Sequence, residues 1–343
     1  MRTTLKLKMG AGLVAATVLM TGAGAAFAAP AVSTDAPAPA ATTSALNVER
    51  EGGADRFSTS AIVSSSFPAG APVAYIASGS SYPDALAGAA AAGYQDGPVL
   101  LTRQDEIPEV VANELARLNP EKIVVLGGTD VISTAVQATL AETAETTRIG
   151  GATRYETAAL VSAELEPGVE VAYIASGANF PDALAGAAVA GVTGGPILLV
   201  EQNAIPAAVT TELARLKPES IVVLGGIDVV TSGVEEALDA TFAPTTRLGM
   251  DDRYDTAALI SRESFEVDRP VVYVASGLDF PDALAGAAAA GSNDSPVLLI
   301  QPNSIPYAVA AELERLNPER IVVLGGTAVL SSDVQYKLDE YLR

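Results

Sequence analysis

The chain has 343 residues, a formal net charge of -21, and neither histidine nor cysteine. The missing residue types exclude disulfides, imidazole or thiolate metal sites and the catalytic triads that use them, and no Gly-x-x-x-x-Gly-Lys-Ser/Thr phosphate loop is present. A chain this acidic lacks the basic surface that nucleic acid and anionic lipid require, so we predict no nucleic-acid partner. Because the motifs and residue types above are missing, we also predict no cofactor.

Residues 1–28 have the pattern of a secretory signal peptide. Three cations precede an apolar run over residues 9–20, and Ala-Phe-Ala at 26–28 provides a cleavage site. The run is short and contains Gly and Thr, which favours a signal over a membrane anchor. Removal of its three cations changes the net charge from -21 to -24, and we expect a secreted protein with no membrane insertion after signal removal. Residues 29–45, rich in Ala, Pro and Thr, are predicted to form a flexible leader.

The rest of the chain is one sequence pattern repeated three times. Ser-Gly-x-x-aromatic-Pro-Asp-Ala-Leu-Ala-Gly-Ala begins at Ser78, Ser176 and Ser276, at intervals of 98 and 100 residues. This period is too long for a solenoid repeat and suits a small domain. We therefore predict three modules: module 1 at 46–146, module 2 at 147–244 and module 3 at 245–343.

Short apolar strands alternate with helices in each repeat. In module 1 we predict strands at 73–77, 98–101 and 123–126, and helices at 84–92, at 108–118 and from Ser133. This alternation predicts an α/β fold in which a parallel sheet is covered on both faces, a small Rossmann-like layer formed three times. The strand at 98–101 is a continuous apolar run and is predicted to be central. The helix at 84–92 is nearly all Ala and Gly, so we expect the modules to contact one another around a pseudo-threefold axis.

Each of these small-residue helices begins with an aromatic-Pro-Asp sequence. The aspartates can accept hydrogen bonds from the first turn and suit the helix dipole, and a ligand or cation contact is the alternative: Asp84, Asp182 and Asp282. The aromatic residues lie where open α/β sheets bind ligands: Tyr82, Phe180 and Phe280. Stacking on a sugar ring is one interpretation, and packing over the neighbouring helix is the favoured one.

Nine arginines recur at three positions of the repeat. Two sets form the motif Arg-x-Gly-x-x-x-Arg: the first is Arg50, Arg148 and Arg247, and the second is Arg56, Arg154 and Arg253. A guanidinium suits carboxylate, phosphate or sugar oxygens, and the favoured alternative is an Arg–Asp pair that holds adjacent repeats in register. The third set lies at the end of a helix, where a cation is favourable, and is predicted to have that role alone: Arg117, Arg215 and Arg315.

Taken in order, these motifs resemble the cell-wall-binding repeat 2 family. The shared pattern is Arg-x-Gly-x-x-x-Arg-Tyr-x-Thr-Ala-Ala, Ala-Ser-Gly-x-x-Phe-Pro-Asp-Ala-Leu-Ala-Gly, Pro-Ile-Leu-Leu and Val-Leu-Gly-Gly, three times over residues 46–343. The resemblance implies three Rossmann-like or Toprim-like modules that pack as a pseudo-threefold disc and hold a wall glycopolymer, typically anionic, without a covalent bond. The departures at Phe57, Met250 and Ala328 bear on whether all three modules bind equally.

We therefore expect a secreted, non-catalytic protein at the cell wall or cell surface that binds a bacterial wall glycopolymer. No catalytic or metal-binding residue is predicted, and the candidates for polymer binding or contact between modules are Arg50, Arg56, Asp84, Arg148, Arg154, Asp182, Arg247, Arg253 and Asp282. The negative charge opposes a polyanion, so attraction requires local arginines, bridging divalent cations or a neutral polymer. Two alternatives stay open: a wall autolysin or N-acetylmuramoyl-L-alanine amidase modifier, and a self-assembling surface-layer unit.

Overall fold

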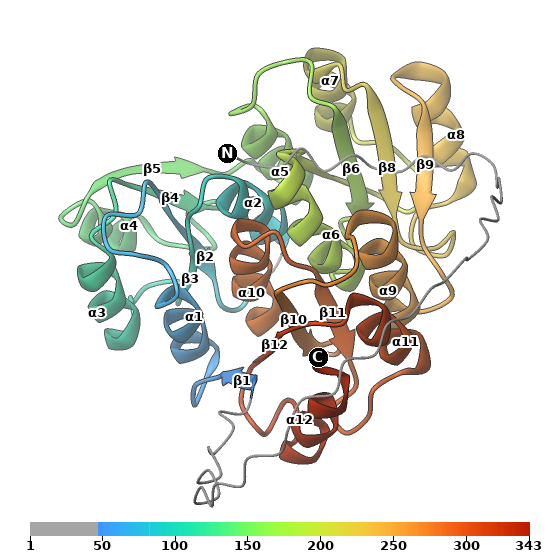
Figure 1. Ribbon diagram of the computed structural model, residues 1–343. Helices are drawn as coiled ribbons and strands as arrows, with labels where there is room; N and C mark the ends of the chain where they lie inside the picture. The colour runs from blue at the N-terminus through green and yellow to red at the C-terminus, as the bar shows by residue number, and fades with distance from the viewer. Residues whose placement is uncertain (1–46, 82) are drawn as a thin grey trace, which may run out of the picture.

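The computed structural model describes residues 47–81 and 83–343 (Figure 1). The predicted signal peptide, the predicted leader and Tyr82 lie outside the described residues. The described residues form three α/β units that surround a common axis, as predicted. None of the helices in this part of the chain has the length and apolar composition needed to cross a membrane.

Each unit contains a four-stranded sheet in which all strands are parallel. The first sheet has the order β3-β2-β4-β5, the second β7-β6-β8-β9 and the third β1-β12-β10-β11. The strands are β1 Val48–Glu51, β2 Ala74–Ser78, β3 Val99–Thr102, β4 Lys122–Leu126, β5 Glu145–Ile149, β6 Val171–Ser176, β7 Ile197–Val200, β8 Ser220–Leu224, β9 Thr245–Leu248, β10 Val271–Ser276, β11 Val297–Ile300 and β12 Arg320–Leu324.

Four helices recur in each unit. The predicted small-residue, amphipathic and last helices are present, and the helix that begins at the second arginine of the motif was not predicted. In chain order the helices are α1 Arg56–Ser64, α2 Pro83–Tyr94, α3 Glu109–Leu118, α4 Thr134–Leu140, α5 Arg154–Ser162, α6 Pro181–Thr193, α7 Ala207–Leu216, α8 Ser232–Thr241, α9 Arg253–Ser264, α10 Pro281–Ser292, α11 Tyr307–Leu316 and α12 Ser332–Leu338, followed by the 3-10 helix η1 Asp339–Tyr341.

The fourth strand of each sheet comes from the segment that begins the next repeat. β5 spans the predicted boundary between modules 1 and 2, and β9 completes the second sheet although it lies in module 3. β1 pairs with β12, so the first and last strands of the described chain lie side by side (Figure 1). The sheets are therefore divided differently from modules 46–146, 147–244 and 245–343. The difference arises because these strands are short, polar and half-exposed, and show no apolar run.

The apolar strands β3, β7 and β11 lie at the sheet edges, so the predicted central position is wrong. They are nevertheless fully buried. β3 contacts α1 of its own unit and α10 of the third unit, while β7 contacts α2 and β11 contacts α6. Helices of a neighbouring unit thus cover edges that would otherwise expose unpaired backbone groups. The continuous apolar run reflects this coverage between units.

Helices α2, α6 and α10 meet at the centre of the molecule (Figure 1). Gly93, Gly191 and Gly291 lie at their contact: a Cβ atom on Gly191 would be 3.1 Å from Cα of Gly291 and 3.3 Å from Cα of Gly93. Glycine inside a helix costs about 1 kcal/mol relative to alanine. The close approach of three backbones explains why it is used here, and it confirms the expected role of the small-residue helices.

Candidate functional site

The second arginine set begins three equivalent helices. Arg56, Arg154 and Arg253 are the first residues of α1, α5 and α9, and each follows an N-cap residue whose side chain accepts a backbone N–H. In each repeat Nη1 of this arginine donates to the carbonyl of the glycine after the first apolar strand: Gly79, Gly177 and Gly277. These bonds fix the guanidinium at the carboxyl ends of parallel strands, where ligands commonly bind.

The same helices join neighbouring units. α1 packs on β3 and α3 of its own unit and also on α10 of the third unit. We call the contact between α10 and α1 seam 3–1, the contact between α2 and α5 seam 1–2, and the contact between α6 and α9 seam 2–3. The second arginine set therefore lies at the seams between neighbouring units.

At seam 3–1, Arg56 forms an ion pair with the neighbouring unit. Its Nη2 lies 3.6 Å from Oδ2 of Asp279, in the loop between β10 and α10. Its guanidinium carbon lies 5.8 Å from the ring centroid of Phe280 in the same loop. The two side chains of the pair are 37% and 51% exposed, so the pair adds only about 0–1 kcal/mol to stability. An Arg–Asp contact between repeats is thus present, although its aspartate is not one of the predicted three.

The predicted aspartates stand at the second position of their helices, after the proline: Asp84, Asp182 and Asp282. Phe180 and Phe280 occupy the N-cap positions of α6 and α10, and neither helix has a side-chain hydrogen bond at its cap. Asp182 and Asp282 are therefore not N-cap residues, but they lie in the first turn after the proline, where a negative charge suits the helix dipole.

The carboxyl groups of Asp182 and Asp282 face the arginine helix of the next unit. Burial raises the pKa of Asp182 to about 6, and the charge of Arg253 opposes this rise. Burial also raises the pKa of Asp282, against a hydrogen bond with Thr59 and the charge of Arg56. Seams 2–3 and 3–1 thus bring a buried carboxyl group close to an arginine of the neighbouring unit.

Seam 2–3 contains a cavity of about 430 Å³ at the carboxyl ends of the strands in the second sheet. Its walls include Asp182 from α6, Arg253 from α9 and Asn179 from the loop between β6 and α6. Further acidic and apolar lining comes from the turns after β8 and β9: Ile227, Asp228, Met250, Asp251 and Asp252. The volume lies in the roughly 300–1,000 Å³ range of ligand pockets. The cavity can therefore hold a sugar-sized group beside a guanidinium.

The first arginine set lies within the sheets, on the closing strands β1, β5 and β9: Arg50, Arg148 and Arg247. Nη1 of Arg148 donates to the carbonyl of Gly127 at 2.8 Å, and its Nε donates to Gln137 at 2.9 Å. Arg50 and Arg247 make the same bond to the equivalent glycine carbonyls at 2.7 Å. This set fastens each closing strand to the Gly-Gly turn and the helix beside it.

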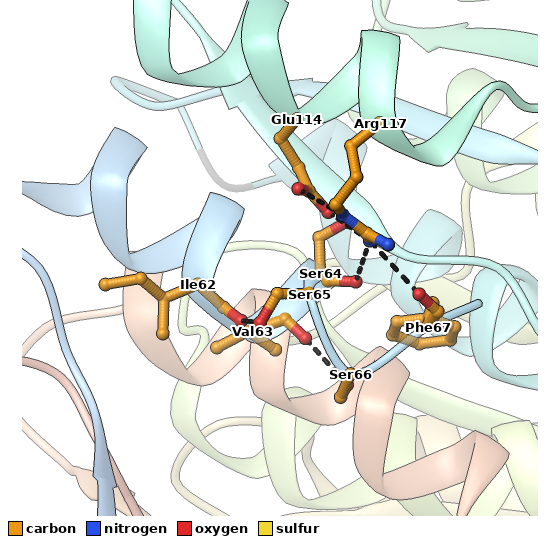
Figure 2. Close-up of polar contacts among 8 residues, drawn as sticks. All are labelled: Ile62, Val63, Ser64, Ser65, Ser66, Phe67, Glu114 and Arg117. Carbon is orange, nitrogen blue, oxygen red and sulfur yellow. Dashed lines mark hydrogen bonds and ion pairs between the residues drawn. The ribbon is translucent and has the colours of Figure 1, made fainter. Parts of the chain in front are cut away.

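The third arginine set has more than the predicted helix-end role. Figure 2 shows Arg117 beside Glu114. Nη2 of Arg117 lies 2.6 Å from Oε1 of Glu114 and also donates to the carbonyl oxygens of Ser64, the last residue of α1, and of Phe67 in the turn that follows. The other repeats form the same pairs: Arg215 with Glu212 and Arg315 with Glu312. The glutamate is buried in all three units. The pair therefore holds its own helix, α3, α7 or α11, against the end of α1, α5 or α9 in the same unit.

Two of the loop aromatic residues meet between units. The rings of Phe180 and Phe280 are 6.1 Å apart at 63°, an edge-to-face contact, and Phe280 is buried. This contact supports the packing interpretation for these two residues, and Tyr82 lies outside the described residues.

The sequence pattern alone did not single out Asp279 or the buried glutamates. Asp279 is not repeated, because Ser81 and Asn179 stand at the equivalent positions. The glutamates recur in Glu-Leu-x-Arg-Leu, at an i,i+3 spacing from the third arginine set, and this spacing was a signal for the pair.

Three segments of the chain, residues 50–137, 148–235 and 247–335, match the family model described as Cell wall binding domain 2 (CWB2). The N-acetylmuramoyl-L-alanine amidase LytC of Bacillus subtilis (strain 168) is 28% identical over 293 residues, which cover 85% of this chain and 58% of that protein. The amidase enhancer of the same strain is 27% identical over 295 residues, which cover 85% of this chain and 40% of that protein. The chain thus spans about half the length of these two relatives.

Two solved structures share the fold. Cwp6 from Clostridium difficile matches with a TM-score of 0.80 at 24% identity, over 86% of this chain and 48% of that chain. Cwp8 from the same organism matches with a TM-score of 0.78 at 25% identity, over 87% of this chain and 52% of that chain. The arrangement of three α/β units therefore also occurs in these two proteins.

Proposed function

Because the chain belongs to the Cell wall binding domain 2 family, whose members attach to the cell wall, we propose that it is an exported protein that binds a wall glycopolymer noncovalently at its seams and performs no catalysis. The observation that carries this proposal is the cavity at seam 2–3, where Arg253 and Asp182 of two different units line one space. Its lining offers hydrogen-bond donors and acceptors to a sugar and a guanidinium to an anionic group.

Local arginines can attract an anionic polymer although the net charge of the chain is negative. A chain with a charge of -21 repels a polyanion at long range, so the attraction must be local. Each arginine of the second set is held by a glycine carbonyl at the carboxyl ends of the strands, and the rest of its planar group can still donate. A polymer with phosphate or carboxylate groups at intervals suits arginines that recur around one axis.

The residue types that the chain contains support binding without catalysis. Without His or Cys it cannot form an imidazole zinc site or a His-dependent nucleophile. Carboxyl groups and arginines remain, and they suit recognition of hydroxyl and phosphate groups. Similarity to the amidase LytC covers 58% of that protein, so it does not carry the amidase activity over to this chain.

A second candidate is a helper that modifies the action of a wall amidase. The 27% identity with the amidase enhancer of Bacillus subtilis favours it over an amidase activity of the chain itself. The two candidates differ in whether a purified wall amidase works faster on walls that carry the bound chain.

Cosedimentation with isolated walls, before and after acid removal of secondary polymers, tests the proposal. We expect binding to intact walls, loss of binding to stripped walls, and no release of soluble muropeptides. Equal binding to both preparations would count against polymer recognition and favour a self-assembling surface-layer unit. Release of muropeptides by the chain alone would contradict the absence of catalysis, and faster hydrolysis by an added amidase would favour the helper.

A further inference from the structure

The three seams differ at one loop position that faces the arginine. At seam 3–1 this position is Asp279, whose carboxylate lies 3.6 Å from Arg56. The equivalent residue is Ser81 at seam 1–2 and Asn179 at seam 2–3. Asn179 and Arg253 both line the cavity at seam 2–3, so the position borders the same space as the arginine there. Seam 3–1 therefore has a carboxylate at this loop position, and the other two seams have an uncharged side chain there.

We propose that Asp279 closes seam 3–1 to the anionic groups of the wall polymer, so that the polymer is held at seams 1–2 and 2–3. This inference rests on the proposed function. It means that the side chain at the loop position of Ser81, Asn179 and Asp279 determines which seams bind the polymer. Ser81 and Asn179 are uncharged, so no carboxylate at this loop position competes with an outside anion for the arginine of their seam.

The carboxylate of Asp279 acts as an internal ligand for Arg56. It stands at ion-pair distance from the guanidinium, where a phosphate or carboxylate of the polymer would have to lie. Phe280 from the same loop lies over that guanidinium, 5.8 Å from the guanidinium carbon. An incoming anion would meet a like charge at this place and would have to displace it. Because both side chains of the pair are more than one-third exposed, the pair contributes little to the stability of the fold. A variant without it should therefore still fold.

Seam 1–2 has fewer acidic groups at the start of its arginine helix than seam 2–3, because α5 has Glu156 in its first turn and α9 has both an aspartate cap and Asp255. α5 is capped by Thr153, whereas α1 and α9 are capped by Asp55 and Asp252. At the start of α5 a single carboxylate, that of Glu156, offsets Arg154 and the positive end of the helix, whereas Asp252 and Asp255 both lie at the start of α9. We therefore rank seam 1–2 above seam 2–3 for an anionic group, with seam 3–1 last.

The test exchanges charge at the loop position with little change of shape. Asp279→Asn removes the carboxylate from seam 3–1, Asn179→Asp adds one to seam 2–3, and Ser81→Asp adds one to seam 1–2. Glu121→Gln and Thr143→Asp are the controls for net charge. Both sites are exposed and precede β4 and β5, at the amino ends of the strands, whereas the seam arginines lie at the carboxyl ends. Cosedimentation with polymer-bearing walls gives the affinity, and thermal melting shows that each variant is folded.

We expect Asp279→Asn to raise the affinity roughly 3- to 10-fold and Ser81→Asp to lower it by a similar factor, with a smaller loss for Asn179→Asp and no change in the controls. A gain of affinity cannot result from loss of folding, so Asp279→Asn is the deciding variant. If its affinity is unchanged or lower, the inference is overturned and the proposed function stands. If the unmodified chain does not bind walls, the proposed function is overturned and the inference with it.

Discussion

Glu51 on β1 stands directly opposite Leu324 on β12, so the first described strand completes the sheet of the last repeat (Figure 1). The equivalent residues in the other closing strands are apolar: Ile149 opposite Leu126 and Leu248 opposite Leu224. Burial raises the pKa of Glu51 to about 7, although Arg320 opposes the rise. One carboxylate oxygen of Glu51 is buried without a hydrogen-bond partner. β1 pairs with the last repeat and so closes the ring of three units. It therefore contains a carboxyl group, that of Glu51, whose protonated form is favoured by burial.

The stability of the ring should decrease as Glu51 becomes ionised. Because its pKa is raised from 4.5 to about 7 on folding, the folded chain keeps a proton that the unfolded chain releases within this window. The free energy of unfolding should fall as pH rises through the window, by about 3 kcal/mol in all, and Glu51 should contribute no further slope above or below it.

Denaturant titrations of the unmodified chain and of Glu51→Gln at several pH values measure this contribution. Asp182, whose pKa is raised to about 6, adds a slope of the same sign to both proteins, so the difference between them isolates Glu51. The difference should be absent in acid, grow as the pH rises and reach a plateau above about pH 7. Parallel stability curves would show that the Glu51 carboxyl group is not buried in the closed ring.

Glycine at the axis should be required for packing. A Cβ atom at Gly191 would lie 3.1 Å from Cα of Gly291, whereas a Cβ atom at Gly233 on α8 would meet nothing within 4 Å. We expect Gly191→Leu to lower the melting temperature sharply or prevent folding, because all three central helices would have to separate. Gly233→Ala, the matched control, should raise stability by up to about 1 kcal/mol through helix propensity. Similar melting temperatures for Gly191→Leu and the unmodified chain would rule out the close axial packing.

Arg215 should matter for stability because it partners a buried carboxylate. Its Nη2 lies 2.7 Å from Oε1 of Glu212, whose side chain is 7% exposed. Arg215→Ala should lower the free energy of unfolding by about 1.5–3 kcal/mol, and adding Glu212→Gln should recover part of that loss. A double-mutant cycle with these two substitutions measures the coupling. Additive effects, with no recovery in the double variant, would mean that the pair is not coupled.

The sequence predicted the repeated α/β units and their axis because both depend on local patterns: short apolar strands, amphipathic helices and the small residues around Gly191. The closing strands were harder to predict, since Arg148 and its neighbours are polar and gain their pairing from a distant turn. The roles of Asp182 and Arg117 were predicted only in part for a related reason. A helix-terminal position suggests a cap or a dipole contact, and only the packed structure shows which neighbouring unit or buried carboxylate faces the side chain.

The most direct test of polymer binding at the seams compares the unmodified chain with Arg154→Gln on polymer-bearing and acid-stripped walls. Lys122→Gln is the control, because it removes one positive charge at the start of β4, at the amino ends of the strands, whereas the second arginine set lies at their carboxyl ends. We predict that the unmodified chain binds only polymer-bearing walls, that Arg154→Gln lowers the affinity by about 10-fold or more, and that Lys122→Gln has no effect. Equal affinities of the unmodified chain and a folded Arg154→Gln variant for polymer-bearing walls would contradict binding at the seams.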